Sequence, residues 1–249
     1  MNSVVTGKRA RYAGAALLAG GLAAAVVAQP MASGARDGEP PNLDGAKSQV
    51  EHYYGDRGDH RPSPESPWAH DVNERVGKAS AYLKARVAAG VPNPAIVLDI
   101  DDTSETTYPV QAEHGFSNDD EMLHQAIRDN KLPAINQTRD LANWAKSHGV
   151  RVFFVTGRKE PMRQPTAAGL HAIGFPEPDG LFLKPTDRAP EYLPCGTHCS
   201  TVGYKSGTRA HLEQQGSTIV ANLGDQASDL SGGHSERSYK LPNPIYYIP

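Results

Sequence analysis

The chain has 249 residues, a formal net charge of −3 and a hydrophobic content of 38%. This length suits one large domain or two small ones, and the apolar content is sufficient for a sizeable core. The near balance of 25 basic and 28 acidic residues excludes a strongly cationic protein that binds a nucleic-acid polymer. With only two cysteines, a disulfide-dense scaffold is excluded as well.

The N-terminus has the pattern of a secretory signal peptide. Three basic residues precede residues 13–28, which are only Ala, Gly, Leu and Val. This run is shorter than the roughly 20 apolar residues that cross a membrane, and the small residues before Ala28 suit a cleavage site. We expect residues 1–28 to be removed near Ala28, so that a secreted protein without stable membrane association remains. A retained anchor is the alternative.

The next segment, residues 29–65, is rich in Gly, Pro, Asp and Arg and poor in apolar residues. This composition predicts a linker with at most one short helix near residues 46–54. Ser66 and Pro67 are typical of a helix N-terminus, and apolar residues at helical spacing follow until Gly90. We therefore expect one folded domain over residues 66–249.

Strand and helix patterns alternate in this domain. Short runs rich in Ile, Val and Leu are typical of buried parallel strands; they occur at residues 95–100, 150–155, 181–183 and 218–223, with 245–248 as a candidate fifth strand. Helical patterns occur at residues 117–130, 135–148, 163–173 and 206–215. The alternation predicts an α/β fold with a mostly parallel sheet and helices on both faces. Ligands bind such sheets at the carboxyl ends of the strands.

The first strand ends in Asp99 and Asp101, two carboxylates that are two residues apart. Carboxylates packed so closely repel each other, and a divalent cation is the simplest compensation. An isolated pair of this kind is more often an acidic loop or a helix cap. A calcium-binding EF-hand loop is excluded, because its sixth and twelfth positions need Gly and Glu, where this chain has Ser104 and Val110.

Two more strands end in polar residues. Thr156, Gly157 and Arg158 close the second strand, and their hydroxyl, backbone amide and guanidinium groups suit a phosphate. An ordinary turn with a surface arginine is the alternative. Asp225 and Asp229 follow the fourth strand and offer oxygen ligands for a hard cation such as Mg²⁺. They could also be a turn residue and a helix cap.

Lys205 lies at the expected start of a helix. A cation there faces the positive end of the helix dipole, which is unfavourable unless anions lie nearby. A phosphate and two carboxylates would supply these anions. Arg209, one turn further on, is the competing residue for this role, and an ordinary surface lysine is the alternative.

The order and spacing of these four motifs resemble the haloacid dehalogenase (HAD) superfamily of phosphohydrolases. They are most similar to the secreted class B and plant vegetative storage protein-like acid phosphatases, and Leu241–Tyr247 also resembles that family. The resemblance covers about residues 66–249. It implies a three-layer, Rossmann-like (HAD-like) fold of about five strands without a large cap domain, in which the first strand lies between the second and the fourth.

The resemblance also implies a role for each motif. Asp99 would be the nucleophile that forms an aspartyl-phosphate, and Asp101 would be the general acid and then the general base. The phosphoryl group would be bound by four residues: Thr156, Gly157, Arg158 and Lys205. The cofactor Mg²⁺ would be held by four aspartates: Asp99, Asp101, Asp225 and Asp229.

The function implied by the resemblance is a secreted, Mg²⁺-dependent acid phosphatase for small phosphomonoesters. Residues 104–134 would form a wall of the pocket, where Tyr108 and Phe116 would stack on a substrate ring or simply pack. The alternative is a non-catalytic storage, phosphate-binding or metal-binding protein on the same scaffold, against which the presence of Asp99 argues. Dehalogenation would not need Asp101. The H-E-x-x-H, G-x-S-x-G and P-loop motifs are absent from the sequence.

The two cysteines, Cys195 and Cys199, enclose three residues in an irregular stretch before Lys205. In an exported protein we expect a disulfide between them. So short a loop would contribute only ~2 kcal/mol in the chain-entropy model, and the bond would hold the approach to Lys205. Zinc bound with His198 is the alternative, although a structural zinc site usually has four ligands.

Overall fold

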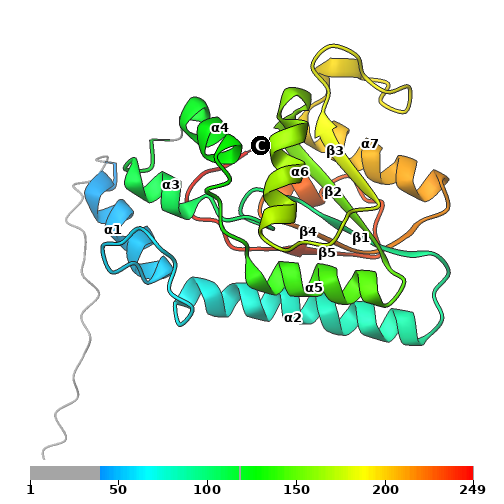
Figure 1. Cartoon of the computed structure of the whole chain (residues 1–249), viewed down its shortest axis with the longest axis horizontal. Helices are drawn as coiled ribbons and strands as arrows, with labels where there is room; N and C mark the ends of the chain where they lie inside the picture. The colour runs from blue at the N-terminus through cyan, green and yellow to red at the C-terminus, as the bar shows by residue number, and fades with distance from the viewer. Residues whose placement is uncertain (1–39, 118, 249) are drawn as a thin grey trace, which may run out of the picture. The chain divides into compact units, whose positions relative to one another are not determined.

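The computed structural model describes residues 40–117 and 119–248 (Figure 1). The expected signal peptide, residues 1–28, lies outside this range. The described fold is a compact unit that starts at Asn42. Among its helices, none has both the length and the apolar character needed to cross a membrane.

Five parallel strands form one sheet in the order β3-β2-β1-β4-β5. They are β1 Pro94–Leu98, β2 Arg151–Lys159, β3 Gly180–Lys184, β4 Thr218–Gly224 and β5 Arg237–Lys240. The predicted α/β fold with a parallel sheet is confirmed, and β1 lies between β2 and β4. Because all strands run in the same direction, the carboxyl ends of β1, β2 and β4 are neighbours at one edge of the sheet.

The prediction of the fifth strand at residues 245–248 is wrong. The strand is Arg237–Lys240, whose side chains are mostly exposed and polar. It is an edge strand, and it needs no apolar run because its side chains are not buried on both faces. The apolar residues at 245–248 have no strand structure; Ile248 is hydrogen-bonded to Gln226, just after β4.

Most helices were predicted close to their observed positions. The long helices are α2 Pro67–Ala88, α4 Asp120–Arg128, α5 Asn136–Ser147, α6 Arg163–Ala172 and α7 Thr201–Gln214. The Ser66 hydroxyl caps α2 by accepting a hydrogen bond from the Ala69 N–H at 3.1 Å. Four short elements had not been predicted: α3 Tyr108–Glu113, α8 Ala227–Leu230, and the 3₁₀ helices η1 Glu160–Met162 and η2 Gly196–His198.

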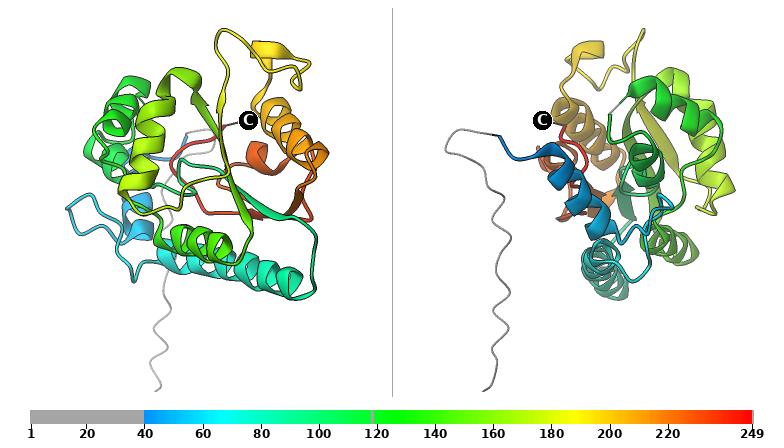
Figure 2. Two further views of the ribbon diagram at one scale, coloured as in Figure 1. Left: turned by 45° about the vertical axis from the view of Figure 1, so that its right-hand side comes forward. Right: turned by 90° about the vertical axis from the view of Figure 1, so that its left-hand side faces the viewer.

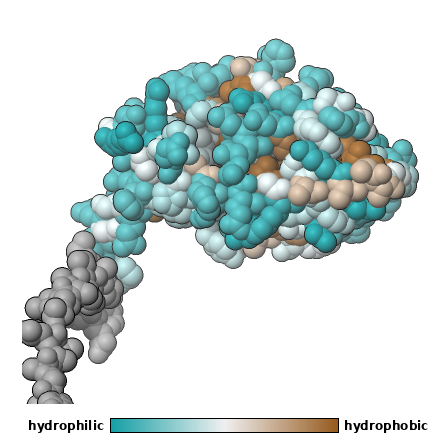
Figure 3. Space-filling view, turned by 90° about the horizontal axis from the view of Figure 1, so that it is seen from below, coloured by the Kyte–Doolittle hydropathy of each residue, from teal (hydrophilic) through white to brown (hydrophobic). Residues whose placement is uncertain are grey.

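Helices cover both faces of the sheet, as predicted (Figures 1 and 2). Side chains alternate along β1, so Ile96 and Leu98 belong to one core and Ala95 and Val97 to another. The first core includes residues of α2 and α5, and the second includes Leu212 and other residues of α7. From the side of α2 and α5 the surface is largely hydrophilic with a few apolar areas, because these helices turn their apolar faces toward the sheet (Figure 3).

The short helix expected near residues 46–54 is α1, Leu43–Tyr54. It packs on the domain: the Tyr54 ring is completely buried and stacks on Trp68 and Tyr108, with ring centroids 4.9 Å and 4.0 Å away. Residues 42–65 are therefore part of the compact unit, although their composition resembles that of a linker. A few aromatic contacts hold this segment, and its low apolar content conceals them in the sequence.

Candidate active site

The polar motifs meet at the carboxyl edge of the sheet. Asp99 directly follows β1, and its N–H donates to the carbonyl of Leu223 in β4 at 3.0 Å. Thr156 lies in β2 and is completely buried. Asp225 follows β4. The parallel topology thus brings three segments that are far apart in the sequence to one place.

Lys205 is a buried cation between two carboxylates. Its ammonium group donates to Asp99 Oδ1 and, at 2.6 Å, to Asp229 Oδ1. Burial alone would lower the pKa of Lys205, but the two carboxylates outweigh this effect and raise the pKa above its ordinary value. The group therefore stays charged in the interior, where it neutralises part of the negative charge.

The predicted position of Lys205 at a helix start is wrong, because α7 begins at Thr201 and Lys205 lies in its second turn. Lys205 is therefore stabilised by direct contacts with two carboxylates, and a position at the positive end of the helix dipole plays no part. The competing residue, Arg209, contacts main-chain carbonyls instead. Its guanidinium donates to those of Asp229, Ser231 and Gly233 at 2.6, 2.6 and 2.9 Å. The structure therefore places Lys205, not Arg209, beside Asp99.

Three buried carboxylates form a cluster that could hold a metal ion. Oxygen atoms of Asp99, Asp225 and Asp229 lie within 4.8 Å of one another. Burial raises the pKa of Asp99 to about 7, although the nearby Lys205 opposes this shift. Burial and the neighbouring carboxylates raise the pKa of Asp225 well above its ordinary value. One ammonium group does not balance three carboxylates, so this set of hard oxygen donors fits a divalent cation.

Asp229 has a structural role as well as a place in this cluster. It is the third residue of α8, and its Oδ2 accepts a hydrogen bond from the Gln226 N–H at 2.8 Å in a capping box. A Cβ atom at Gly224 would lie 2.4 Å from the Asp229 Cβ, which no side chain allows. The alternative of Asp229 as the N-cap residue is wrong, because the N-cap is Gln226. Capping from the third helical position is compatible with a place in the acidic cluster, and Gly224 makes the close approach possible.

Asp101 lies outside the carboxylate cluster and faces Arg158. The Arg158 Nε donates to Asp101 Oδ2 at 3.1 Å, and NH2 donates to Asp101 Oδ1 at 2.7 Å. NH2 also donates to Glu105 Oε2 at 2.5 Å. Arg158 is only 7% exposed. The side chain expected to bind phosphate is thus hydrogen-bonded to the carboxylates of Asp101 and Glu105.

Asp102, for which the sequence suggested no role, shapes the loop after β1. Its backbone adopts a φ of +52°, a left-handed conformation that Asp tolerates better than most residues. Its carboxylate accepts hydrogen bonds from the Thr107 N–H and hydroxyl at 2.9 and 2.5 Å. Burial raises the pKa of Asp102 to about 6, while the bonds from Thr107 oppose the shift. These bonds fix the first motif to the start of α3.

Tyr108, expected to stack on substrate or to pack, is a packing residue. It is completely buried, its ring stacks on Tyr54, and its hydroxyl donates to Asp56 Oδ2 at 2.7 Å. No face of the ring is free for a substrate. Phe116 is partly buried, with its ring centroid 6.1 Å from that of Tyr108.

The segment that follows β5, which resembles the family in sequence but had no predicted role, also contacts the site. The Asn243 side-chain amide donates to Asp225 Oδ2 at 2.7 Å. The Gln226 side chain donates to the same oxygen at 2.6 Å, and its Oε1 accepts from the Ile248 N–H at 3.1 Å. Residues 243–248 therefore lie against the acidic cluster. Their signal was the Pro-Asn-Pro stretch before Ile245, which a strand would not contain at its centre.

The expected disulfide between Cys195 and Cys199 is present. It encloses η2 and ends two residues before α7, the helix that carries Lys205. Within the described residues no cysteine is free. The bond thus lies close to the start of this helix, as the sequence analysis supposed.

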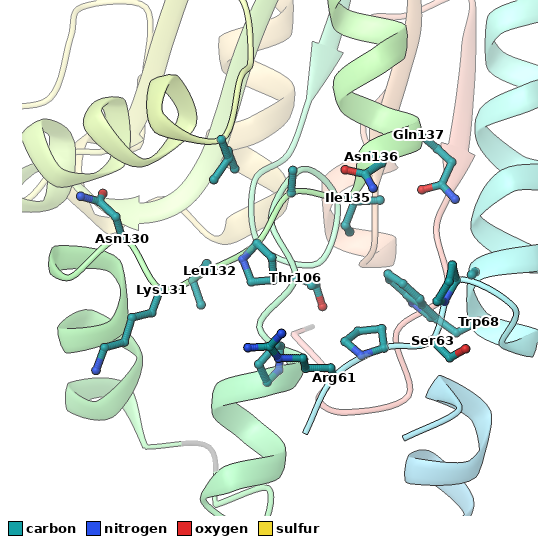
Figure 4. A pocket seen from close by; sticks show the side chains of 17 residues that line it. Arg61, Ser63, Trp68, Thr106, Asn130, Lys131, Leu132, Ile135, Asn136 and Gln137 are labelled. Carbon is teal, nitrogen blue, oxygen red and sulfur yellow. The ribbon is translucent and has the colours of Figure 1, made fainter. Parts of the chain in front are cut away.

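A cavity of about 690 Å³ lies elsewhere in the domain (Figure 4). Its wall combines the segment before α2, including Arg61 and Ser63, with residues 130–137, which connect α4 to the first residues of α5. The motif residues Asp99, Asp101, Lys205 and Asp225 do not line it.

Comparisons with known proteins agree with this geometry. The model of the family described as HAD superfamily, subfamily IIIB (Acid phosphatase), matches residues 64–249. Stem 28 kDa glycoprotein of Glycine max is 33% identical over 68% of this chain, and Acid phosphatase 1 of Solanum lycopersicum is 34% identical over 72%. The matched regions span 65% and 68% of those two proteins, about two thirds of their lengths.

The fold is also found in a solved structure, the class C acid phosphatase from Bacillus anthracis. The TM-score is 0.63 at 20% identity, and the match covers 82% of this chain and 86% of the other. At this identity the likeness supports the fold alone. It confirms the predicted HAD-like arrangement of the sheet and its helices.

Proposed function

Because the chain belongs to the acid phosphatases of HAD subfamily IIIB, we propose that it is a secreted, Mg²⁺-dependent acid phosphatase that hydrolyses small phosphomonoesters. The observation that carries the proposal is the buried contact between Asp99 and Lys205, beside Asp225 and Asp229. A carboxylate at a strand end, a fixed cation and a place for a divalent ion are the parts that phosphoryl transfer to a carboxylate needs.

Asp99 is the proposed nucleophile. Its carboxylate would attack phosphorus, form an aspartyl-phosphate and release the alcohol. Attack requires the ionised form, and the contact with Lys205 favours that form against the effect of burial. Lys205 would then neutralise charge on the phosphoryl oxygens, which is favourable because the cation is already in place before the reaction.

Asp99, Asp225 and Asp229 are the residues proposed to hold Mg²⁺. The cation would offset negative charge on the transferring phosphoryl group. The family resemblance adds Asp101 through its main-chain carbonyl. Thr156, in the carboxyl-terminal half of the neighbouring strand β2, would bind a phosphoryl oxygen.

Asp101 is the proposed general acid and base. It lies two residues from Asp99, and its side chain is 21% exposed, more than those of Asp99 and Asp229. Access matters because Asp101 must reach the leaving oxygen and then the water that attacks the aspartyl-phosphate. Asp99 is buried and Asp101 is partly exposed, so the two tasks are divided between the two residues.

The alternative is a storage or binding protein on the same scaffold. Initial rates with a panel of phosphomonoesters, with Mg²⁺ and after chelation by EDTA, separate the two. We expect turnover that is lost with EDTA and restored by Mg²⁺. Asp99→Asn should abolish it, whereas the matched surface change Asp140→Asn should not, since Asp140 is on the exposed side of α5. Binding of Mg²⁺ without turnover of any ester by the wild type would support the alternative.

A further inference from the structure

We propose that Arg158 and Glu105 form a buried pair that positions the carboxylate of Asp101 and that Arg158 does not bind the phosphoryl group. This proposal rests on the proposed function, because it concerns the proton transfer assigned to Asp101. It gives a task to Glu105, a buried acid that the mechanism does not otherwise use, and it changes the task of Arg158.

The hydrogen bonds of Arg158 leave its side chain few donors for a ligand. Nε and NH2 both contact the carboxylate of Asp101, and NH2 also contacts Glu105 at 2.5 Å. The remaining nitrogen, NH1, donates to the Thr166 hydroxyl of α6 at 3.3 Å. Each nitrogen therefore has a protein acceptor, and the side chain is almost fully buried.

Glu105 fixes the far side of the guanidinium. Its side chain is 3% exposed, and in the described residues its only salt-bridge partner is Arg158. A Cβ atom at Gly169 would lie 3.1 Å from Glu105 Oε1, so α6 packs closely against this carboxylate. Burying an unpaired acid is costly, and Arg158 is the cation that makes its burial tolerable.

The partners of the two cations also favour a positioning role for Arg158. Arg158 contacts Asp101, the proposed proton donor, and Glu105, but not the proposed nucleophile. Lys205, in contrast, contacts Asp99 directly. The two cations thus have separate tasks: Lys205 acts where phosphorus is attacked, and Arg158 holds the carboxylate that exchanges protons.

A planar guanidinium suits this task because Nε and NH2 contact the two oxygens of one carboxylate in a fixed orientation. Proton transfer requires the acid within hydrogen-bond distance of the leaving oxygen, and small displacements of a reacting group reduce the rate strongly. We therefore expect loss of Arg158 to imitate loss of Asp101 rather than loss of a phosphate ligand.

The test compares kcat/KM for an alkyl phosphate and for p-nitrophenyl phosphate in wild type, Arg158→Met, Asp101→Asn and the double variant. This parameter reports the steps up to formation of the aspartyl-phosphate, so a slow second step does not disturb it. Inhibition by inorganic phosphate is measured in parallel. The matched control is Arg86→Met, which removes another bidentate pair, with Glu236 at the opposite end of the sheet.

We expect Arg158→Met to reduce kcat/KM for the alkyl phosphate by roughly 10²-fold and to affect p-nitrophenyl phosphate far less. The inhibition constant of phosphate should stay within about twofold, and the change should add little once Asp101 is Asn. Equal losses on both esters with much weaker phosphate inhibition would overturn the proposal, because they describe a phosphate ligand.

Two further arms keep the test decisive. Glu105→Gln keeps an acceptor but removes the charge. It should cause a smaller loss of kcat/KM that is again selective for the alkyl phosphate. An unchanged kcat/KM would show that Glu105 does not help to position Asp101. If Arg158→Met does not fold by circular dichroism, Arg158→Lys replaces it, and full activity of that variant would contradict the need for a planar group. Failure of the proposed function is a separate result: the wild type itself would hydrolyse neither ester.

Discussion

Asn243 donates its side-chain amide to Oδ2 of Asp225 at 2.7 Å, which joins the segment after the last strand to the buried acidic cluster. This contact orients a proposed metal ligand from outside the sheet. Among residues 40–117 and 119–248, the other oxygen of Asp225 has only one hydrogen-bond contact, a long one of 3.4 Å from the Thr103 hydroxyl. One carboxylate oxygen is thus held by amides, while the other is available to a cation.

Asn243→Ala should therefore weaken Mg²⁺ binding. Loss of such an outer partner typically reduces metal affinity about 10–100-fold, and calorimetric titration with Mg²⁺ measures it without any turnover. Asn136→Ala, an exposed position at the start of α5, is the control. Unchanged affinity in Asn243→Ala would show that Asp225 needs no external support.

Asp101→Asn should affect substrates according to their leaving groups. An alkoxide leaves poorly without a proton, whereas a nitrophenolate leaves readily. General acid catalysis contributes roughly 10²–10⁴-fold, so kcat/KM for alkyl phosphates should fall by far more than kcat/KM for p-nitrophenyl phosphate. Equal falls for both esters would mean that Asp101 does not protonate the leaving group.

The metal-free protein should gain stability as the pH falls below neutrality. The pKa of Asp99 is about 7 in the folded protein and near 3.8 without the fold. Between these values the folded state binds a proton that the unfolded chain has lost, so the free energy of unfolding rises as the pH falls. Urea unfolding in EDTA at several pH values measures this slope.

The matched variant for that experiment is Asp99→Asn, which has no titrating carboxyl at this position. Its slope between about pH 7 and pH 4 should be flatter than that of the wild type, whereas Asp140→Asn should retain the wild-type slope. Identical slopes in Asp99→Asn and the wild type would contradict the raised pKa of Asp99.

Asp56→Asn should destabilise the domain at neutral pH. The carboxylate accepts the Tyr108 hydroxyl and three backbone N–H groups. Burial opposes ionisation, but these hydrogen bonds outweigh it and lower the pKa of Asp56 below 3.8. Its contribution is therefore complete above pH 3.8 and is lost as the pH falls through the lower, folded value.

Chemical unfolding at neutral pH should show a loss of about 1–3 kcal/mol for Asp56→Asn. The loss in the free energy of unfolding should be much smaller for Asp140→Asn, because Asp140 is exposed. If Asp56→Asn proved as stable as the wild type, the loop after α1 would not depend on this carboxylate.

The disulfide predicts a simple mass difference. Intact-mass analysis should find that the mass of the native protein is about 2 Da below that of its reduced form, because forming the disulfide removes two hydrogen atoms. The double change Cys195→Ser with Cys199→Ser should reduce stability by only ~2 kcal/mol, because the closed loop is short. Two free thiols in the native protein would contradict the bond.

The sequence predicted the parts of this molecule whose residues carry a regular pattern. The apolar run before Asp99 and the one before Thr156 identified β1 and β2, because both strands are buried on two faces. The Ser66-Pro67 pair located the start of α2. The motif order placed the acidic and basic groups at one edge, since parallel strands share their direction.

The remaining features depend on tertiary contacts that have no local pattern. The edge strand β5 carries polar side chains, so its backbone pairing with β4 cannot be inferred from periodicity. Tyr108 has the same residue type whether it stacks on a ligand or on Tyr54. Arg158 suits a phosphate in isolation, and only the fold brings Glu105 and Asp101 to its nitrogens.

The position of Asn243 has a consequence for biosynthesis. A nascent chain that ends before β4 already contains Asp99, but it lacks Asp225 and the amide that orients it. The acidic cluster can be complete only after nearly the whole domain has been synthesised. Binding of the proposed metal ion would then be a late event, and the compartment in which the finished chain folds, rather than the one in which translation starts, would determine which cation it meets first.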